Sequence, residues 1–277
     1  MKTILLGKYI DRLASLNDQL CFFQFNRNEL NKRLAEFGAN VGKLYTPDVF
    51  AQNAMAPRIN VTIEDLPNFQ NLNQTLTFGS YISTSYEVVS YFLRDSLDLL
   101  HQLNPTTFQP RRDDHLEEKY NLTLLSSNCT PISFEIINTL KYIRLRRNHF
   151  THLSETVDNT LETLIINSGH SLNTFWTNSR TQLDFTSMNV LTFQEEETID
   201  LLKLLRIIVQ TLDTNLASNL SHTGIVSFLA NREYATSTQR TNNDIYLQRI
   251  RRIRTLCNLE FGINIPENII DPIVRTI

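Results

Sequence analysis

The stretch IDLLKLLRIIVQTLDTNL at residues 199–216 carries leucine, isoleucine or valine on most sides of a helix with 3.6 residues per turn. The capping-box pattern TFQE at residues 192–195 precedes it, and the successive glutamates at 195–197 suit the positive end of a helix dipole. A helix that is apolar around nearly its whole circumference needs other elements around it. We therefore expect this helix in the middle of a helical bundle or in a subunit interface.

The composition of the chain favours the same all-α fold. Hydrophobic residues make up 41% and charged residues 20% of the 277 residues, whereas Gly (7) and Pro (8) are scarce. This balance is typical of helix-rich soluble proteins and not of sheet-rich or disordered chains. Because no internal repeat or low-complexity segment marks a boundary, we expect residues 1–277 to form a single helical domain.

Charge and cysteine content exclude several classes of protein. The formal net charge is −3, so binding to nucleic acid requires local basic patches and not a global positive field. The cysteines are odd in number and far apart, which argues against a disulfide framework and against a cysteine zinc site. An apolar run at the start ends at Lys8, and no later stretch suits a bilayer, so we expect a cytoplasmic protein without a membrane partner.

Helical periodicity extends outward from the central stretch. Helices are expected at 3–37 (one long helix or a hairpin of two), 85–103, from Thr130 and Pro131 to about His152, from a cap at Ser154 and Glu155 onward, at 224–234 and at 244–257. Residues 44–80 contain many Asn, Gln and Pro residues and are predicted to be loop-like. Within them, an irregular segment near 58–64 contains an alternating patch at 59–63 that predicts a short strand.

The run KYIRLRRNHFTHL at residues 141–153 gathers the residue types that phosphate chemistry needs. On a helix, the apolar stripe from Ile136 to Phe150 passes through position 147, where Arg147 stands instead of an apolar residue. An unpaired guanidinium is costly to bury. Arg147 is therefore expected in a cleft or a subunit interface, where an anion or a carboxylate meets it.

Two further residues of this run point to acid–base chemistry. Asn148 and His152 are four residues apart and share a helix face, so the amide and the imidazole can hold a common ligand. Arg147 lies roughly 140° around the helix from His152, but its long side chain can bring the guanidinium near the ring. Attack by the 2′-hydroxyl of RNA needs a base that titrates near neutrality and a cation for the developing charge. The run therefore predicts RNA cleavage without a metal ion.

The sequence RNHFTH at residues 147–152 resembles the R-[polar]-x-x-x-H signature of the HEPN superfamily, in its common Arg-Asn form. The resemblance covers a HEPN-like core at about 80–170, with extensions at 1–79 and 171–277, and it makes the helix at 85–103 the packing partner of the motif helix. It implies a helical bundle that forms a homodimer, in which two copies of the motif build one composite site. Arg147 and His152 would be the catalytic pair, and Asn148 would orient or bind phosphate. The products would be a 2′,3′-cyclic phosphate and a 5′-hydroxyl.

Additional RNA contacts are expected from two basic clusters and one histidine. These candidates are Arg144, Arg146, His149, Arg251 and Arg252. Arg144 and His149 repeat the Arg-x4-His spacing, but Leu145 stands where the signature has a polar residue. His149 and His152 have the spacing of a metal-binding pair, yet no third ligand accompanies them, so we expect neither metal nor cofactor. Solvated basic surfaces without RNA are the alternative for both clusters.

The expected function is that of a metal-independent endoribonuclease, acting as a toxin or a phage-defence effector with RNA as substrate and an antitoxin or regulatory protein as partner. One alternative is a non-catalytic HEPN module that binds a nucleotide or a protein. A second alternative is a helical dimeric scaffold in which Arg147 pairs with a carboxylate.

Overall fold

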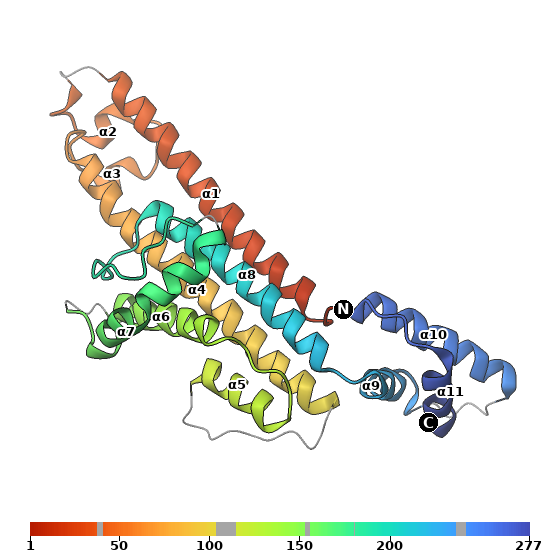
Figure 1. Cartoon of the computed structure of the whole chain (residues 1–277). Helices are drawn as coiled ribbons and strands as arrows, with labels where there is room; N and C mark the ends of the chain where they lie inside the picture. Colours follow the sequence, from red (N-terminus) through yellow and green to blue (C-terminus); the bar gives the residue numbers. More distant parts are fainter. Residues whose placement is uncertain (38–40, 104–114, 153–155, 180, 237–241) are drawn as a thin grey trace.

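The computed structural model describes the chain except for residues 38–40, 104–114, 153–155, 180 and 237–241 (Figure 1). Its longer helices are α1 (Leu6–Glu36), α4 (Leu66–Leu103), α5 (Leu116–Ser126), α6 (Phe134–Thr151), α7 (Asn159–Trp176), α8 (Glu195–Asn219), α9 (His222–Tyr234), α10 (Asn243–Phe261) and α11 (Glu267–Thr276). In the described residues the regular structure is helical, apart from one isolated bridge between Tyr45 and Thr62. The prediction of an all-α fold is confirmed. None of the helices described here is long and apolar enough to cross a membrane.

Residues 199–216 predicted a helix in the middle of a bundle or in a subunit interface, and α8 lies in the bundle with one side, at Ile199, Gln210 and Thr214, exposed. It packs against α1 and α4, which also touch each other (Figure 1). Its buried apolar side chains are Leu201, Leu202, Leu204, Leu205, Ile208, Val209, Leu212 and Leu216. The helix starts at Glu195 with Gln194 as N-cap, and the backbone N–H of Gln194 donates to Glu197 Oε2 at 3.3 Å. The capping box therefore lies two residues after the one expected from TFQE.

The two long partners of α8 are α1, which runs antiparallel to it, and α4 (Figure 1). For residues 3–37 the structure selects the first of the two predicted alternatives, one long helix, which spans Leu6–Glu36. The prediction of a loop-like segment at 44–80 is wrong for its second half, because α4 is continuous from Leu66. Asn and Gln residues there favour a helix only weakly, but Phe78 and Ile82 are fully buried against the core. Tertiary packing of this apolar face thus extends the helix beyond what local propensity indicates.

The segment between α1 and α4 contains two short helices, α2 (Thr46–Val49) and α3 (Ala56–Ile59), at the tip of the α1–α4 arm (Figure 1). The predicted strand at 59–63 is wrong, since only Thr62 takes part in a bridge. Asn60 ends α3 in the left-handed region with a φ of 46°, which breaks an extended conformation within the alternating patch.

Helices α6 and α7 pack together on the side of α4. Trp176 Nε1 on α7 donates to Thr139 Oγ1 on α6 at 2.8 Å. Gly79 on α4 admits the ring of Phe150, because a Cβ at Gly79 would lie 2.3 Å from Cε2 of that ring. The helix at 85–103 is thus part of the packing partner of the motif helix, as expected.

The starts of α6 and α7 also differ from the predicted caps. Ser133, and not Thr130, caps α6 and accepts a hydrogen bond from Ile136 N. Asp158 caps α7 and accepts from Thr160 N at 2.7 Å. The cap predicted at Ser154 and Glu155 lies outside the described residues. In both cases the residue that provides the cap is a short polar side chain nearer the helix.

Helices α9, α10 and α11 pack on one another at the end of the molecule away from the α2–α3 tip (Figure 1). The amino terminus reaches this end, where Lys2 N donates to Phe261 O at 3.1 Å. Thr3 N donates to Asp213 Oδ2 on α8 at 3.0 Å. The amino-terminal residues thus connect the central bundle to α10.

Candidate functional site

A pocket of about 330 Å³ opens where the end of α6 meets the starts of α5 and α7. Its lining residues are His115, Lys141, Arg144, Leu145, Asn148, His149, His152, Asp158 and Thr160. Three imidazoles and two permanent cations therefore border one volume. We call it the imidazole pocket. Asn148 and His152, which the sequence predicted to share a helix face, both line it.

His152 lies at the C-terminal end of α6 and is exposed to solvent. Its backbone amide donates to Asn148 O at 3.0 Å, which ends the helix. The position leaves the imidazole side chain at the rim of the pocket. It is therefore available for proton exchange with a bound group and with water.

Arg144 is held in the pocket wall by a buried carboxylate. Its Nε donates to Glu117 Oε1 at 2.8 Å, and the Glu117 side chain is 0% exposed. Tyr86 OH donates to the other carboxylate oxygen at 3.5 Å. Burial, assisted by the charge of Glu117, raises the pKa of Tyr86, so this hydroxyl stays a donor. The Nη groups of Arg144 form no hydrogen bond within the described part of the chain and remain free for an anion.

His149 has a different role from the one predicted. It is buried, and its Nε2 accepts a hydrogen bond from Asp158 N at 2.8 Å. An accepting nitrogen carries no proton, so the imidazole is neutral in this arrangement. His149 therefore fixes the entry of the chain into α7, and its accepting nitrogen is not free to bind RNA.

Asp158 brings a negative charge to the edge of the imidazole pocket. Hydrogen bonds from the side chain and the backbone of Thr160 hold the pKa of the Asp158 carboxyl below its usual range. The carboxylate is thereby used as the cap of α7. The negative charge beside the cations of the pocket is therefore already stabilised by the first turn of α7.

Lys141 lies half-buried on the same wall as Asn148. Among the residues that the structure describes, it has neither an ion-pair nor a hydrogen-bond partner. An unpaired ammonium beside three imidazoles gives the pocket an affinity for anions.

Arg147 does not line the imidazole pocket, although the sequence predicted that its guanidinium would approach His152. Its Nη2 forms an ion pair with Glu87 on α4, and its Nη1 donates to Asn148 Oδ1 at 3.3 Å. The guanidinium also lies 6.0 Å from the ring centre of Tyr86. The carboxylate expected opposite Arg147 is thus present in the same chain, and the arginine orients the amide of Asn148.

Arg146 occupies the most buried position of the basic run. Its side chain is 0% exposed, and it forms an ion pair with Glu197 at the start of α8. Its Nη2 also donates to Thr192 O at 2.7 Å, and its Nε donates to Val190 O at 3.2 Å. Because its donors are used inside the protein, Arg146 holds the segment before α8 and cannot serve the RNA contact assigned to it.

Arg251 and Arg252 are not brought to this pocket. Both are exposed on α10, which packs with α9 and α11 at another end of the molecule (Figure 1). Arg252 Nε lies 3.6 Å from Glu233 Oε2 on α9. The two basic clusters of the sequence therefore form separate surfaces.

His115 is the pocket residue that sequence reasoning missed. It is the N-cap of α5 and lies more than 30 positions before His149, so no local spacing relates the two. Only the packing of α5 against α6 brings its imidazole to the same volume. In the part of the chain that is described, no cluster of three or more His, Cys, Asp or Glu residues has the spacing to hold a metal ion.

Comparison of the chain with protein-family models, with curated proteins and with solved structures gave no match. The chemistry of the site therefore rests on its own residues. Imidazoles, cations and an amide around one open pocket suit the binding of a phosphodiester and the transfer of protons to and from its oxygens.

Proposed function

We propose that this protein is a metal-independent endoribonuclease of the HEPN type and that the imidazole pocket holds the scissile phosphate. The observation that carries the proposal is the meeting of Asn148 and His152 with the imidazole of His115 and the cations of Lys141 and Arg144 around one pocket. The signature at residues 147–152 and this grouping support the same chemistry independently, because His115, Lys141 and Arg144 are not part of the signature.

The proposed reaction is an internal transesterification. His152 takes the proton of the 2′-hydroxyl while the 2′-oxygen forms a bond to phosphorus. The bond between phosphorus and the 5′-oxygen breaks, and the imidazolium of His115 donates a proton to this leaving oxygen. Arg144 stabilises the negative charge of the phosphorane, and Asn148 orients the phosphate. The products are a 2′,3′-cyclic phosphate and a 5′-hydroxyl.

Arg147 enters the proposal through a second copy of the chain. On α6 it faces Glu87 and not the imidazole pocket, so its charge does not act on a phosphate in the pocket of its own chain. In the homodimer that the resemblance implies, the motifs of two copies face each other, and each Arg147 contributes to the composite site. Activity should then depend on dimer formation.

The test compares cleavage of a labelled single-stranded RNA by the wild type and by His152→Ala, with and without EDTA. Loss of a proton-transfer group should lower the rate about 10²- to 10⁴-fold. His170→Ala is the matched control, because His170 is an exposed histidine on α7 that does not line the imidazole pocket. Cleavage that EDTA abolishes, or full activity of an Arg147→Ala, His152→Ala double variant, contradicts the proposal.

A role as a toxin or phage-defence effector in the cytoplasm, controlled by an antitoxin or regulatory protein, belongs to the same proposal and rests on the resemblance alone. Expression of the wild type should then arrest growth, and expression of His152→Ala should not. Equal growth of the two strains at equal protein levels argues against this role.

One observation favours a second candidate, a non-catalytic HEPN module that binds a nucleotide or a protein. Arg147 is engaged by Glu87 and Asn148 within the chain, which makes it a structural residue of the α4–α6 contact. In that case the wild type leaves RNA intact, and Arg147→Ala lowers the melting temperature.

A further inference from the structure

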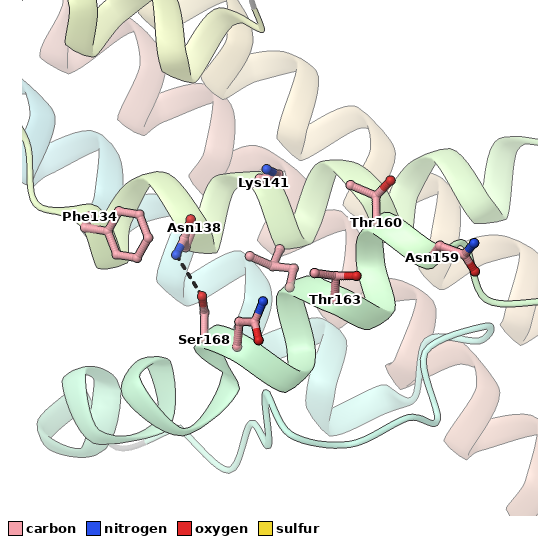
Figure 2. A pocket seen from close by; sticks show the side chains of 9 residues that line it. Phe134, Asn138, Lys141, Asn159, Thr160, Thr163 and Ser168 are labelled. Carbon is pink, nitrogen blue, oxygen red and sulfur yellow. Dashed lines mark hydrogen bonds between the residues drawn. The ribbon is translucent and has the colours of Figure 1, made fainter.

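A second groove runs between α6 and α7 beside the imidazole pocket, with a volume of about 530 Å³ (Figure 2). Figure 2 shows side chains of the two helices on either side of it, with a hydrogen bond from Asn138 Nδ2 to Ser168 Oγ at 3.0 Å. Lys141 and Thr160 line both this groove and the imidazole pocket. The two hollows are therefore neighbours along α6 and meet at Lys141 and Thr160.

Five of the α6 residues that line the groove or the imidazole pocket form one regular stripe, which we call the track. Phe134, Asn138, Lys141, Asn148 and His152 follow one another at intervals of three, four or seven residues, which places them on one face of the helix. The stripe spans roughly 27 Å at 1.5 Å per residue. This length is greater than one nucleotide needs, so the track can hold several consecutive nucleotides.

The chemistry of the groove suits an unpaired nucleobase. The ring of Phe134 is 65% exposed at the outer end of the groove, where a flat aromatic surface is open for stacking. Asn138 is 5% exposed, and its amide nitrogen is engaged by Ser168, so its position is fixed. Asn159 and Asn167 add further amides, which present donors and acceptors of the kind that base edges require.

Lys141 links this groove to the reaction proposed above. Its ammonium has no partner within the described residues and lies where the groove joins the imidazole pocket. A phosphate placed there would flank the scissile phosphate. The bases of a duplex are stacked and paired and cannot enter such a groove, whereas those of a single strand can.

We propose that the α6–α7 groove is the binding site for the nucleotides that flank the scissile phosphate of a single-stranded RNA. One base stacks on Phe134 and is contacted by the amide of Asn167, and a flanking phosphate binds Lys141. This proposal rests on the proposed function, because the RNA strand is taken to run from the groove toward His152, where cleavage is proposed. It makes the enzyme selective for unpaired RNA.

The test measures binding of a fluorescent single-stranded RNA whose 2′-hydroxyls are methylated, so that it cannot be cleaved. Fluorescence anisotropy should show tighter binding of this strand than of the same strand in a duplex. Phe134→Ala should weaken binding of the single strand about tenfold, since stacking of one base accounts for such a loss. The matched control is Phe25→Ala on α1, where a similarly exposed phenylalanine (59%) lies outside the groove.

Lys141→Gln provides a second, independent readout. It should reduce the dependence of the affinity on salt by about one phosphate contact, while Phe134→Ala leaves this dependence unchanged. Equal affinity for single strand and duplex, or wild-type affinity of Phe134→Ala, overturns the groove proposal. If the methylated strand binds as expected but unmodified RNA is never cleaved, the groove proposal stands and the proposed function fails.

Discussion

The basic residues of α6 and those of α10 look alike in the sequence but form surfaces of different kinds. On α10 the arginines meet exposed carboxylates from neighbouring helices: Arg254 lies 2.7 Å from Glu267 and Arg252 lies 3.6 Å from Glu233. On α6, Arg144 and Arg146 pair with Glu117 and Glu197, and Lys141 is left without a carboxylate in the described residues. On α10, Arg252 and Arg254 are paired near the surface, whereas on α6 part of the positive charge faces a pocket.

This difference comes from the neighbouring helices and not from the basic runs. α10 packs against α9 and α11, which carry Glu233 and Glu267 at its edges. α6 packs against α4, α5 and α7, and these bring His115 and Asp158 to its exposed face. A run of arginines in a sequence therefore does not by itself predict a basic surface, because carboxylates on neighbouring helices can neutralise it.

The largest expected effect is on stability, and it concerns the buried arginine of α6. Arg146→Met should remove about 3–5 kcal/mol from the free energy of unfolding, because it leaves Glu197 without its partner and two backbone carbonyls without donors. Arg254→Ala on α10 breaks an exposed pair and should cost less than about 1 kcal/mol. Urea unfolding of both variants measures the difference. Equal losses of unfolding free energy in the two variants would mean that the ion pairs of α6 and α10 contribute equally to stability.

A smaller effect is expected for two carboxylates, one opposite α6 and one that α10 itself carries. Glu117→Gln keeps the shape of a fully buried side chain but removes the charge opposite Arg144, so a loss of about 1–3 kcal/mol is expected. Glu260→Gln removes a partly exposed carboxylate beside Arg232, which lies 2.6 Å away, and should change stability by less than about 1 kcal/mol. Unfolding in urea again gives both values, and a larger loss for Glu260→Gln would reverse the comparison.

The smallest effect concerns the caps of the helices that border each cluster. Asp158 caps α7 and has a lowered pKa through its hydrogen bonds with Thr160, whereas Asn242 caps α10 and does not titrate. A lowered pKa stabilises the fold above the ordinary carboxyl range, and this stabilisation is lost as the pH falls through the lowered value. Asp158→Asn should therefore melt like the wild type at neutral pH and lose less stability toward about pH 3.

The reciprocal change serves as the control for this prediction. Asn242→Asp introduces a titrating cap at α10 and should make melting more sensitive to acid than in the wild type. Melting temperatures that fall in parallel for the wild type and Asp158→Asn would show that the cap of α7 does not contribute to the acid sensitivity.

The local sequence predicted most helices. It did not predict the helical segments in which tertiary packing outweighs a weak helix propensity. The apolar stripes of α1, α8 and α10 are strong enough to define these helices without knowledge of the fold. The first half of α4 is different, because its Asn and Gln residues favour a helix weakly and its burial against α1 decides the matter. The caps were misplaced because several Ser, Thr and Asp residues precede each helix.

The candidate site divides in the same way. The spacing of Asn148 and His152 predicted that they share a face, and both line the imidazole pocket. The sequence placed Arg147 in the apolar stripe, whereas the structure buries its neighbour Arg146 most deeply. Burial depends on which helix covers each arginine: α8 covers Arg146, α5 covers Arg144 and α4 meets Arg147.

The sequence by itself determined that this protein is all-α and that residues 199–216 form a strongly apolar helix, because the period of the apolar residues is a property of each segment alone. Only the tertiary structure decided which histidines and cations share a pocket. His115, Lys141 and His152 come from different turns and different helices, and their distance in space depends on how these helices pack. The periodicity of apolar residues cannot predict that packing, because it describes each helix separately.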